Sequence, residues 1–305
     1  MNPELILSVV VSCYKQEAYI AQCLNSIFDQ KVNFKYEIII ADDCSPDRTR
    51  DVILTEVAQY TGVVRLLFND INVGAARNYL SLHEQARGKY VAHMDGDDVM
   101  LAGKLQSQVD VMERNPECNI VFHRSRYFSD DGSYLSDTGS LFGSVETVAI
   151  SPNQLARWGT IAAHSTYMYR RSTRKTHEYR RDFMEWFFAF EAVLNGGVGA
   201  YINTIYLKYR CNPIGDSYLA SRNGRAKAYM IIIQHVIDYF EEYPEFRSDL
   251  YAQQLVNVLM YIKNIRRIRW FMLWFLLKHS YLFRVGKVSE VIRVRRMVGP
   301  FKKIR

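Results

Sequence analysis

Four runs of β-branched and other apolar residues dominate the first hundred positions of the 305-residue chain. The first is L-I-L-S-V-V-V-S at residues 5–12, and the others cover 36–41, 63–68 and 89–94. Predominantly apolar runs of this length are typical of strands buried on both faces. Segments with helical periodicity separate them, so the sequence predicts βαβ units and an α/β fold with a mostly parallel sheet flanked by helices. We expect these helices at residues 17–28, 48–60 and 74–85.

Polar residues stand where three of the predicted strands end. The carboxyl ends of parallel strands lie at one edge of a sheet, and ligands of such sheets bind outside that edge. The sequence therefore predicts that segments far apart in the chain meet at one crevice. The three clusters are Ser12-Cys13-Tyr14, Asp42-Asp43 and Asp95-Gly96-Asp97-Asp98.

The acids Asp95 and Asp97 point to a divalent cation. Two carboxylates held close together resist joint ionisation unless a cation lies between them. Carboxylate oxygens suit Mg²⁺ or Mn²⁺, and Mg²⁺ usually completes its shell with phosphate oxygens and water. Such a site would hold a nucleoside diphosphate. The alternative is a solvated turn with adventitious acids, but the position at the end of a buried strand, with Asp42 and Asp43 at another strand end, favours the metal site.

Two common phosphate-binding loops are absent from the sequence. Residues 12–16, after the first strand, contain no glycine, so they do not form the glycine-rich turn of a dinucleotide-binding fold, and no Walker A motif occurs. Phosphates would therefore be held by the metal and by basic side chains. Arg77, in N-V-G-A-A-R-N, is the best-placed candidate, with an ordinary surface arginine as the alternative.

The remainder of the chain changes character near residue 215. Up to that point strands and helices continue, whereas after Asn212-Pro213 the pattern is helical to about Phe283. We expect two domains, at residues 1–214 and 215–305. Before the change we expect helices at 101–112 and 182–194, strands at 119–128, 164–170 and 200–209, and an irregular segment at 130–160.

Four motifs in order resemble the family 2 glycosyltransferases of the GT-A fold. The resemblance covers residues 5 to about 125, and it implies a nucleotide-sugar donor, a divalent metal at the D-x-D motif and inversion at the anomeric carbon. The motifs are S-V-V-V-S-C-Y-K-Q-E-A-Y-I-A-Q-C-L-N-S-I, Y-E-I-I-I-A-D-D-C-S-P-D-R-T, N-V-G-A-A-R-N and G-K-Y-V-A-H-M-D-G-D-D.

The resemblance implies a nucleotide site built from the first three motifs. Ser12 and Tyr14 would border the nucleoside, with Tyr14 against the base. Asp43 would accept a hydrogen bond from the base, with Asp42 beside it, and Arg77 would lie near the nucleotide.

The fourth motif implies the metal ligands. Asp97 would be the main ligand, and Asp95 would lie near both the ribose and the metal. Asp98 would tune the site or cap the helix that follows. His93, inside the strand that precedes the acids, is expected to be a core residue.

The resemblance places a catalytic base about 90 residues downstream of the D-x-D motif. In R-D-F-M-E-W-F-F-A-F-E we favour Glu185 over Asp182, because Glu185 directly precedes Trp186 and an aromatic neighbour raises a carboxyl pKa by desolvation. The usual aspartate is replaced or shifted here, and an exposed helix acid is the alternative. His164 and Trp186 are expected at the acceptor wall, with a structural histidine as the alternative for His164.

A strongly basic segment ends the chain. Residues 263–305 hold 13 Lys and Arg against one acid, a net charge of +12, whereas the preceding residues carry 26 basic and 31 acidic side chains, a net charge of −5. The run I-R-W-F-M-L-W-F-L-L at 268–277 has an apolar core of eight residues, and a spanning helix needs about 20. Aromatic residues flanked by cations suit a helix in an anionic membrane interface. Packing on the catalytic domain or in a homodimer is the alternative, and no nucleic-acid-binding module is recognised.

We therefore expect an inverting, Mg²⁺- or Mn²⁺-dependent glycosyltransferase of hexosyltransferase type, using a UDP-sugar or another nucleotide sugar. Its acceptor would be a glycan that grows on a lipid carrier, as in cell-surface polysaccharide biosynthesis. The enzyme would be peripheral at the inner face of the plasma membrane. The N-terminus lacks a basic leader, and five scattered cysteines suit a reducing cytoplasm. The alternatives are a sugar nucleotidyltransferase and a non-catalytic nucleotide-sugar-binding protein.

Overall fold

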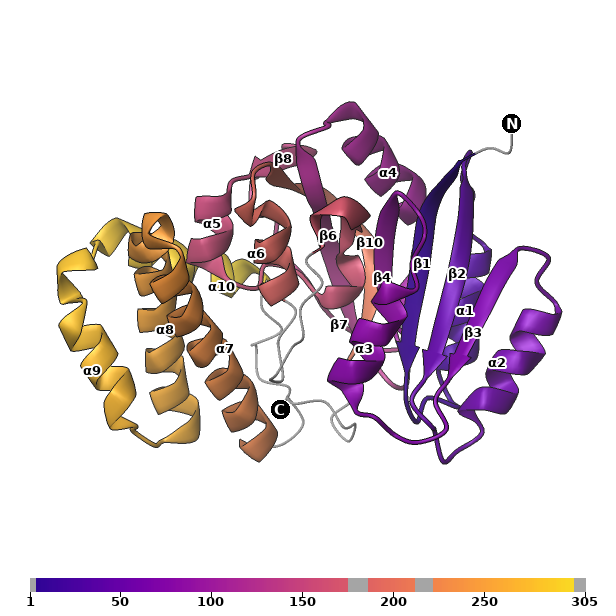
Figure 1. Cartoon of the computed structure of the whole chain (residues 1–305), viewed down its shortest axis with the longest axis horizontal. Coiled ribbons are helices and arrows are strands. Elements are labelled where there is room, and N and C mark those ends of the chain that lie inside the picture. Colours follow the sequence, from indigo (N-terminus) through magenta and orange to yellow (C-terminus); the bar gives the residue numbers. More distant parts are fainter. Residues whose placement is uncertain (1–3, 175–185, 212–221, 299–305) are drawn as a thin grey trace.

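One mixed sheet runs through most of the molecule in the computed structural model, which describes residues 4–174, 186–211 and 222–298 (Figure 1). Within these residues the strand order is β3-β2-β1-β4-β9-β6-β10-β5, with β7 added beside β6 and β8 beside β10. The strands are β1 (Leu5–Cys13), β2 (Lys35–Asp42), β3 (Val63–Phe68), β4 (Tyr90–Asp95), β5 (Val99–Met100), β6 (Cys118–Ser129), β7 (Tyr134–Asp137), β8 (Thr147–Ile150), β9 (Met168–Arg170) and β10 (Val198–Cys211).

The first four strands of this order, β3, β2, β1 and β4, are parallel, as the alternating pattern predicts. The short strand β9 then pairs antiparallel with both β4 and β6, and β6 pairs parallel with the long strand β10. The predicted α/β fold is therefore confirmed, although the sheet is mixed and its parallel strands are concentrated in the first half of the chain.

Helices cover both faces of the sheet and continue beyond its edge (Figure 1). Short 3₁₀ turns also occur at His164–Thr166, Arg171–Thr173, Pro244–Phe246 and Ser280–Leu282. The helices are α1 (Ile20–Phe28), α2 (Thr49–Ala58), α3 (Ala75–Glu84), α4 (Lys104–Arg114), α5 (Pro152–Trp158), α6 (Trp186–Leu194), α7 (Arg222–Glu242), α8 (Arg247–Ile265), α9 (Trp270–Lys278) and α10 (Val285–Val298).

The central strand β1 supplies apolar side chains to two separate cores. Val9 and Val11 pack with residues of α1, α2 and α4, whereas Val10 packs with residues of α3, α6 and the C-terminal helices. Successive residues of a strand point to opposite faces, so consecutive apolar residues such as Val9, Val10 and Val11 are what a doubly covered strand requires.

The prediction of an irregular segment at residues 130–160 is wrong, because the structure places β7, β8 and α5 there. Helix α5 begins with a capping box: the Ser151 hydroxyl accepts from the Gln154 backbone N–H, and the Gln154 side chain accepts from the Ser151 backbone N–H. Pro152 occupies the first turn. The sequence S-P-N-Q carries this signal and could have revealed the helix.

From residue 222 to residue 298 the described chain is helical, and α10 extends the expected helical region beyond Phe283. The expected boundary at residues 214 and 215 lies outside the described residues, so the division into two domains stays a prediction. None of the helices in the described ranges combines the length and apolarity needed to cross a bilayer.

Candidate active site

The parallel register brings the three polar clusters to one edge of the sheet. Ser12 in β1 lies opposite Ala41 in β2 and opposite Asp95 in β4, and Cys13 lies opposite Asp42. The strand ends are therefore aligned within a residue of one another. This alignment confirms the expectation that the clusters share one edge.

Gly96 separates the two acids of the D-x-D motif because there is no room for a side chain. Its N–H donates to the Ser12 carbonyl oxygen at 3.0 Å, which holds the turn against β1. A Cβ atom on Gly96 would lie 2.2 Å from Oε1 of Gln16 and 2.9 Å from Cδ1 of Ile20, closer than van der Waals contact permits. The turn between the acids therefore packs directly against the start of α1.

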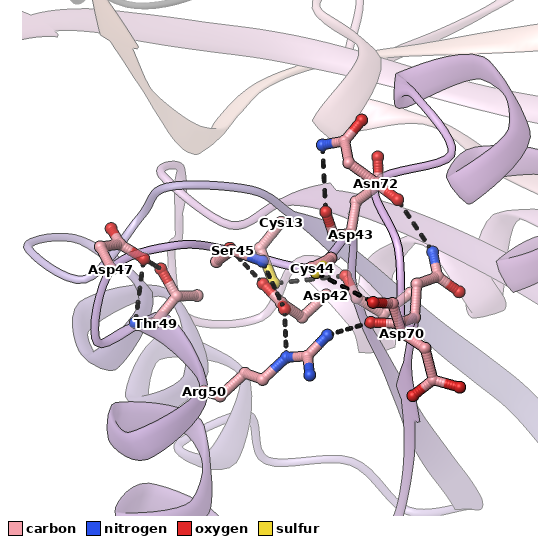
Figure 2. Close-up of polar contacts among 12 residues, drawn as sticks. Cys13, Asp42, Asp43, Cys44, Ser45, Asp47, Thr49, Arg50, Asp70 and Asn72 are labelled. Atoms are coloured by element: carbon pink, nitrogen blue, oxygen red, sulfur yellow. Dashed lines mark hydrogen bonds and ion pairs between the residues drawn. The ribbon is translucent and has the colours of Figure 1, made fainter.

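Asp42 serves as an anchor between β2 and α2 (Figure 2). Its side chain is fully buried, and it accepts from the backbone N–H of Ser45 at 3.0 Å, from the Ser45 hydroxyl and from Arg50 Nε at 2.6 Å. The Arg50 guanidinium also donates to the carbonyl oxygen of Asn69, at the end of β3. Charge-assisted bonds of this kind fix the loop after β2 in place.

Asp43 is also buried, and its carboxylate organises the loop before α3. Oδ1 accepts from the backbone N–H of Val73 at 2.8 Å and from Asn69 at 2.9 Å, and Oδ2 accepts from the N–H of Gly74 at 2.8 Å. Gly74 has φ of +88°, which favours glycine at this position. Figure 2 shows the Asn72 side chain donating to the Asp43 carbonyl oxygen, at 3.1 Å.

Two asparagines that the sequence analysis did not select connect these loops. The Asn69 amide that donates to Asp43 also lies 3.2 Å from Oδ1 of Asn78, and Asn78 in turn donates to the Ser12 hydroxyl at 3.2 Å. This network links the ends of β1, β2 and β3 to the first turn of α3. Asn78 is the last residue of N-V-G-A-A-R-N, so the motif itself was the signal for it.

Tyr14 and Arg77 lie at the exposed rim of this edge. Tyr14 is half-buried, with the Lys15 ammonium 5.0 Å from its ring centre, and Arg77 is exposed on the first turn of α3. Ser12 is half-buried as well. These three predicted side chains therefore remain accessible, whereas Asp42 and Asp43 are occupied by protein donors.

Asp95, the last residue of β4, and the two acids that follow it have different environments. Asp98 is buried; its Oδ2 lies 2.5 Å from the Ser165 hydroxyl and its Oδ1 accepts from the Arg210 N–H at 2.9 Å. Asp95, whose side chain is 38% exposed, lies 3.0 Å from Nε2 of His93. Asp97 is half-buried.

These environments separate the pKa values of the acids. Burial and the charge of Asp95 raise the pKa of Asp97 to about 7, and burial raises the pKa of Asp98 well above its usual range. Burial would also raise the pKa of Asp95, but the hydrogen bond from His93 and the nearby imidazoles of His93 and His164 lower it to about 2. The cluster is short of positive charge, which is the condition a divalent cation relieves.

A line of buried aromatic side chains extends behind Asp95. His93 Nδ1 lies 3.0 Å from Nε2 of His83, and His83 Nδ1 lies 2.7 Å from the Tyr169 hydroxyl. The ring of His164 stacks on that of His93 with centroids 4.0 Å apart. His93 is buried, as expected of a core residue, but it also contacts the site directly.

Two sets of residues could hold a metal ion. Within the described part of the chain, one ligand atom each from His93, Asp95 and His164 lie within 4.8 Å of one another. An imidazole binds metal in its ring plane, however, and stacked rings do not direct their nitrogens at one ion; both nitrogens of His93 also have other partners. The accessible carboxylates Asp95 and Asp97 fit Mg²⁺ or Mn²⁺ better, since both ions prefer oxygen ligands.

Of the residues expected on the acceptor side, only Trp186 and His164 lie in the part of the chain that the structure describes. Glu185 and Asp182 lie outside it. Trp186 begins α6 with its ring in the core, where Nε1 donates to the Leu155 carbonyl oxygen at 2.9 Å. His164 lies beside the metal-side acids, with Nε2 3.3 Å from the Tyr79 hydroxyl, and burial lowers its pKa well below the usual range.

Arg210, at the end of β10, is a site residue that no local sequence pattern predicts. Its Nε donates to the carbonyl oxygen of Asp97 at 2.9 Å, and its guanidinium carbon lies 4.5 Å from the ring centre of Tyr19 and 4.4 Å from that of Phe128. The backbone of the acid turn is thereby held against a strand from the other half of the sheet.

Comparisons with known proteins show what the chain resembles. The sequence profile described as "Glycosyl transferase family 2" matches residues 8–178. The "Putative teichuronic acid biosynthesis glycosyltransferase TuaG" of Bacillus subtilis is 34% identical over 135 residues, which are 44% of this chain and 52% of TuaG. The chain spans from 38% to 76% of the length of the curated relatives compared with it, and 52% or less of TuaG and of the mycobacterial relatives.

Two solved structures share the fold at low sequence identity. Staphylococcus aureus TarS 1–349 has a TM-score of 0.62 at 18% identity and covers 96% of this chain and 83% of its own, and TarS has also been solved with UDP-GlcNAc. The mannosyltransferase PcManGT of Pyrobaculum calidifontis, in complex with GDP-Man and Mn²⁺, has a TM-score of 0.57 at 15% identity, with 99% and 89% covered.

Proposed function

This chain belongs to glycosyl transferase family 2, and we propose that it is an inverting, metal-dependent glycosyltransferase of hexosyltransferase type. The observation that carries the proposal is the convergence of Ser12, Asp95 and Asp97 at one sheet edge, beside the asparagine network that orders the loops around them. The arrangement supports a nucleotide-sugar donor bound across the carboxyl ends of β1, β2 and β4.

In the proposed donor site the nucleoside lies along Ser12 and Tyr14, at the accessible part of the edge. Asp43 shapes this surface through the loop at residues 69–74, since its carboxylate already accepts three protein hydrogen bonds. Arg77, exposed on α3, is placed to meet negative charge on the donor.

Asp95 and Asp97 would hold the divalent ion, and a bound ion stabilises negative charge on the leaving diphosphate. Arg210 and Ser165 keep this turn in position through the Asp97 carbonyl oxygen and the Asp98 carboxylate. PcManGT in complex with Mn²⁺ supports a divalent metal in this fold, without deciding between Mg²⁺ and Mn²⁺ here.

For transfer with inversion, the acceptor hydroxyl oxygen bonds to the anomeric carbon while the bond from that carbon to the diphosphate oxygen breaks. The electron pair of the broken bond leaves with the diphosphate, and the hydroxyl proton passes to a carboxylate. We assign this base to Glu185, with Asp182 as the second candidate.

The donor is proposed to be a UDP-sugar, with other nucleoside diphosphate sugars as alternatives. TarS has been solved with UDP-GlcNAc and PcManGT with GDP-Man, so the shared fold accommodates both nucleotides. The acceptor is proposed to be a glycan, carried on a lipid at the inner face of the plasma membrane, in cell-surface polysaccharide biosynthesis. The similarity to TuaG supports this assignment.

Substitutions of Asp97 and of Glu185 should separate donor binding from sugar transfer. Asp97→Asn should abolish metal-dependent UDP binding, measured by calorimetry with Mn²⁺ present, and should lower donor turnover by about 100-fold or more. Glu185→Gln should lower turnover to a similar degree while UDP binding persists, because the base does not contact the nucleotide. Glu84→Gln, at the exposed far end of α3, is the matched control and should change neither.

The pattern of losses decides between the functions. Full turnover in Glu185→Gln together with loss in Asp182→Asn would move the base to Asp182. Metal-dependent nucleotide binding without any sugar transfer or donor hydrolysis in the unmodified protein would support a non-catalytic binding protein instead. Unchanged UDP binding in Asp97→Asn would contradict the metal assignment.

A further inference from the structure

The helix α9 presents an apolar stripe to solvent at the outer end of the molecule, at the side remote from β1, β2 and β3 (Figure 1). Trp270 is 84% exposed and Trp274 is 68% exposed, and Leu277 continues the same face at spacings of four and three residues. Tyr281, which is also exposed, follows in the 3₁₀ turn after α9. We call these four residues the outer stripe.

The opposite face of α9 holds the helix in place. Met272 and Phe275 are buried, and the rings of Phe275 and Phe240 in α7 lie 4.9 Å apart in an edge-to-face arrangement. The Tyr251 hydroxyl of α8 donates to the carbonyl oxygen of Leu276 at 3.1 Å. Packing therefore accounts for one face of α9 and leaves the outer stripe unexplained by the fold.

Large aromatic side chains are rarely left in water as a continuous patch. Burial of a tryptophan side chain is strongly favourable, and contiguous exposed apolar surface generally marks an interaction site. Tryptophan and tyrosine also combine an apolar ring with a polar hydrogen-bonding group, which suits the boundary between water and lipid.

Cations flank the outer stripe along the sequence. Residues 263–289 contain no aspartate or glutamate. In the described ranges, none of the five exposed cations beside the stripe has a carboxylate within ion-pair distance, whereas Lys287, further along, is paired with Asp249 at 2.9 Å. The five are Arg266, Arg267, Arg269, Lys278 and Arg284, which we call the basic border.

We propose that the outer stripe and the basic border form a docking surface for an anionic phospholipid membrane. The stripe enters the headgroup region with α9 parallel to the membrane plane, and the basic border contacts lipid phosphates. This inference goes beyond the proposed reaction and does not depend on it. A lipid-linked acceptor would, however, be brought to the enzyme by the same surface.

Charge favours a membrane over a second copy of the chain. In a two-fold dimer the same patch occurs on both partners, so the basic borders of two copies would face each other across the interface. Such a contact places like charges together with no acids within residues 263–289 to neutralise them. An anionic lipid surface neutralises the same border.

The molecule contains its own reporters for this test. Trp158 and Trp186 are buried, whereas Trp270 and Trp274 lie on the outer stripe. We expect sedimentation of the full-length protein with vesicles of equal parts phosphatidylglycerol and phosphatidylcholine, but weak sedimentation with pure phosphatidylcholine. Binding should shift tryptophan emission to shorter wavelength, and brominated lipids should quench it. Added salt should weaken binding by screening the border.

Two sets of variants separate the apolar and the charged contributions. Trp270→Ser with Trp274→Ser should abolish the emission shift and reduce sedimentation. Arg266→Gln, Arg267→Gln and Arg269→Gln together should lower the partition coefficient by about 100-fold, since each surface charge contributes about a five-fold factor. Sugar transfer to a soluble acceptor should be unchanged in both.

Matched control variants remove the same number of exposed apolar or charged side chains at positions away from α9. Leu54→Ser with Val63→Ser removes exposed apolar groups from the nucleotide-binding half, and Lys31→Gln, Lys35→Gln and Arg114→Gln remove three exposed charges there. These variants should bind vesicles like the unmodified protein. Equal loss in controls and test variants, absence of vesicle binding, or a dimer in light scattering that the tryptophan substitutions dissociate would overturn the proposal.

Discussion

At the residue scale, the direction of each hydrogen bond behind Asp95 follows from one fact: an ionised carboxylate can only accept. Nε2 of His93 must then be the donor to Asp95, and in that tautomer Nδ1 of His93 accepts from Nε2 of His83. His83 in turn accepts at Nδ1 from the hydroxyl of Tyr169. Burial raises the pKa of Tyr169, which keeps this hydroxyl protonated as the donor.

This chain of donors should matter for metal binding because it orients the Asp95 carboxylate. His93→Phe removes the donor and should weaken Mn²⁺ binding in the presence of UDP by about 10- to 100-fold, the usual effect of losing a group that supports a ligand. His93→Gln keeps an N–H near the same position and should retain most of the affinity. Calorimetric titration with Mn²⁺ measures both.

Equal losses in His93→Phe and His93→Gln, at equal thermal stability, would show that the hydrogen bond does not support the site. The sequence indicated that His93 was buried, but it carried no sign of the partners of His93. Those partners come from α3 and β9, which are brought together only by the fold.

At the element scale, the main role of Asp43 is to join the end of β2 to the start of α3. Its carboxylate is buried and does not face solvent. Its carboxylate accepts from two successive backbone N–H groups, those of Val73 and Gly74, and from the side chain of Asn69. These donors lie at the N-terminal end of α3, where backbone N–H groups have no partner within the helix and a negative charge is favourable.

Asp43→Asn should therefore destabilise the protein by about 2–3 kcal/mol, because an amide nitrogen would face backbone donors in a buried position. Urea denaturation measures the change, and hydrogen exchange should show faster exchange at Val73 and Gly74. Glu84→Gln, at the exposed end of the same helix, should leave stability unchanged. A fully stable Asp43→Asn variant that fails to bind UDP would instead indicate a direct contact with the nucleotide.

The elements that the sequence predicted best are those with a single dominant pattern. The run at 63–68 matches β3 from end to end, and the buried runs of β1, β2 and β4 match within a residue or two. Residues 130–160 were missed because β7 and β8 are short and mostly exposed, so they lack a clear apolar alternation. Only the last part of 164–170 is a strand, since a 3₁₀ turn occupies His164–Thr166.

At the scale of the whole molecule, one apolar core joins the sheet to the C-terminal helices. Val10 of β1, Phe190 of α6, Phe240 of α7 and Phe275 of α9 belong to the same cluster. A polar contact crosses this region as well: Arg157 of α5 donates to Asp249 of α8 at 2.6 Å. The long-range contacts could not be predicted from a change in composition near residue 215.

A shared core predicts cooperative unfolding. Scanning calorimetry of the full chain should show one transition, and a chain ending at residue 214 should be insoluble or bind the apolar dye ANS, because its half of the core would be exposed. A chain ending at residue 298 serves as the control and should unfold like the full chain. Two separate transitions, or a soluble fragment 1–214 with a sharp melting transition, would instead support two independent domains.

The site likewise has one part that could be predicted from the sequence and one part that could not. The alternation of strands and helices in the first hundred residues predicted a parallel sheet, so the sequence predicted that Ser12, Asp43 and Asp95 would share an edge. Arg210 comes from a strand more than a hundred positions later, and its role depends on the pairing of β10 with β5 and β6. No local pattern encodes such a contact.

The central claim is that Asp95 and Asp97 bind a divalent ion that holds the diphosphate of a sugar donor at the end of β4. Its most direct test is a crystal structure of the full chain with UDP and Mn²⁺, using anomalous scattering to locate the metal. We predict one manganese peak within coordination distance of Asp97 or Asp95 and of the diphosphate oxygens, with the uridine beside Ser12 and Tyr14. A manganese peak bound by His93 and His164 without Asp97, or UDP bound away from this edge, would contradict the account.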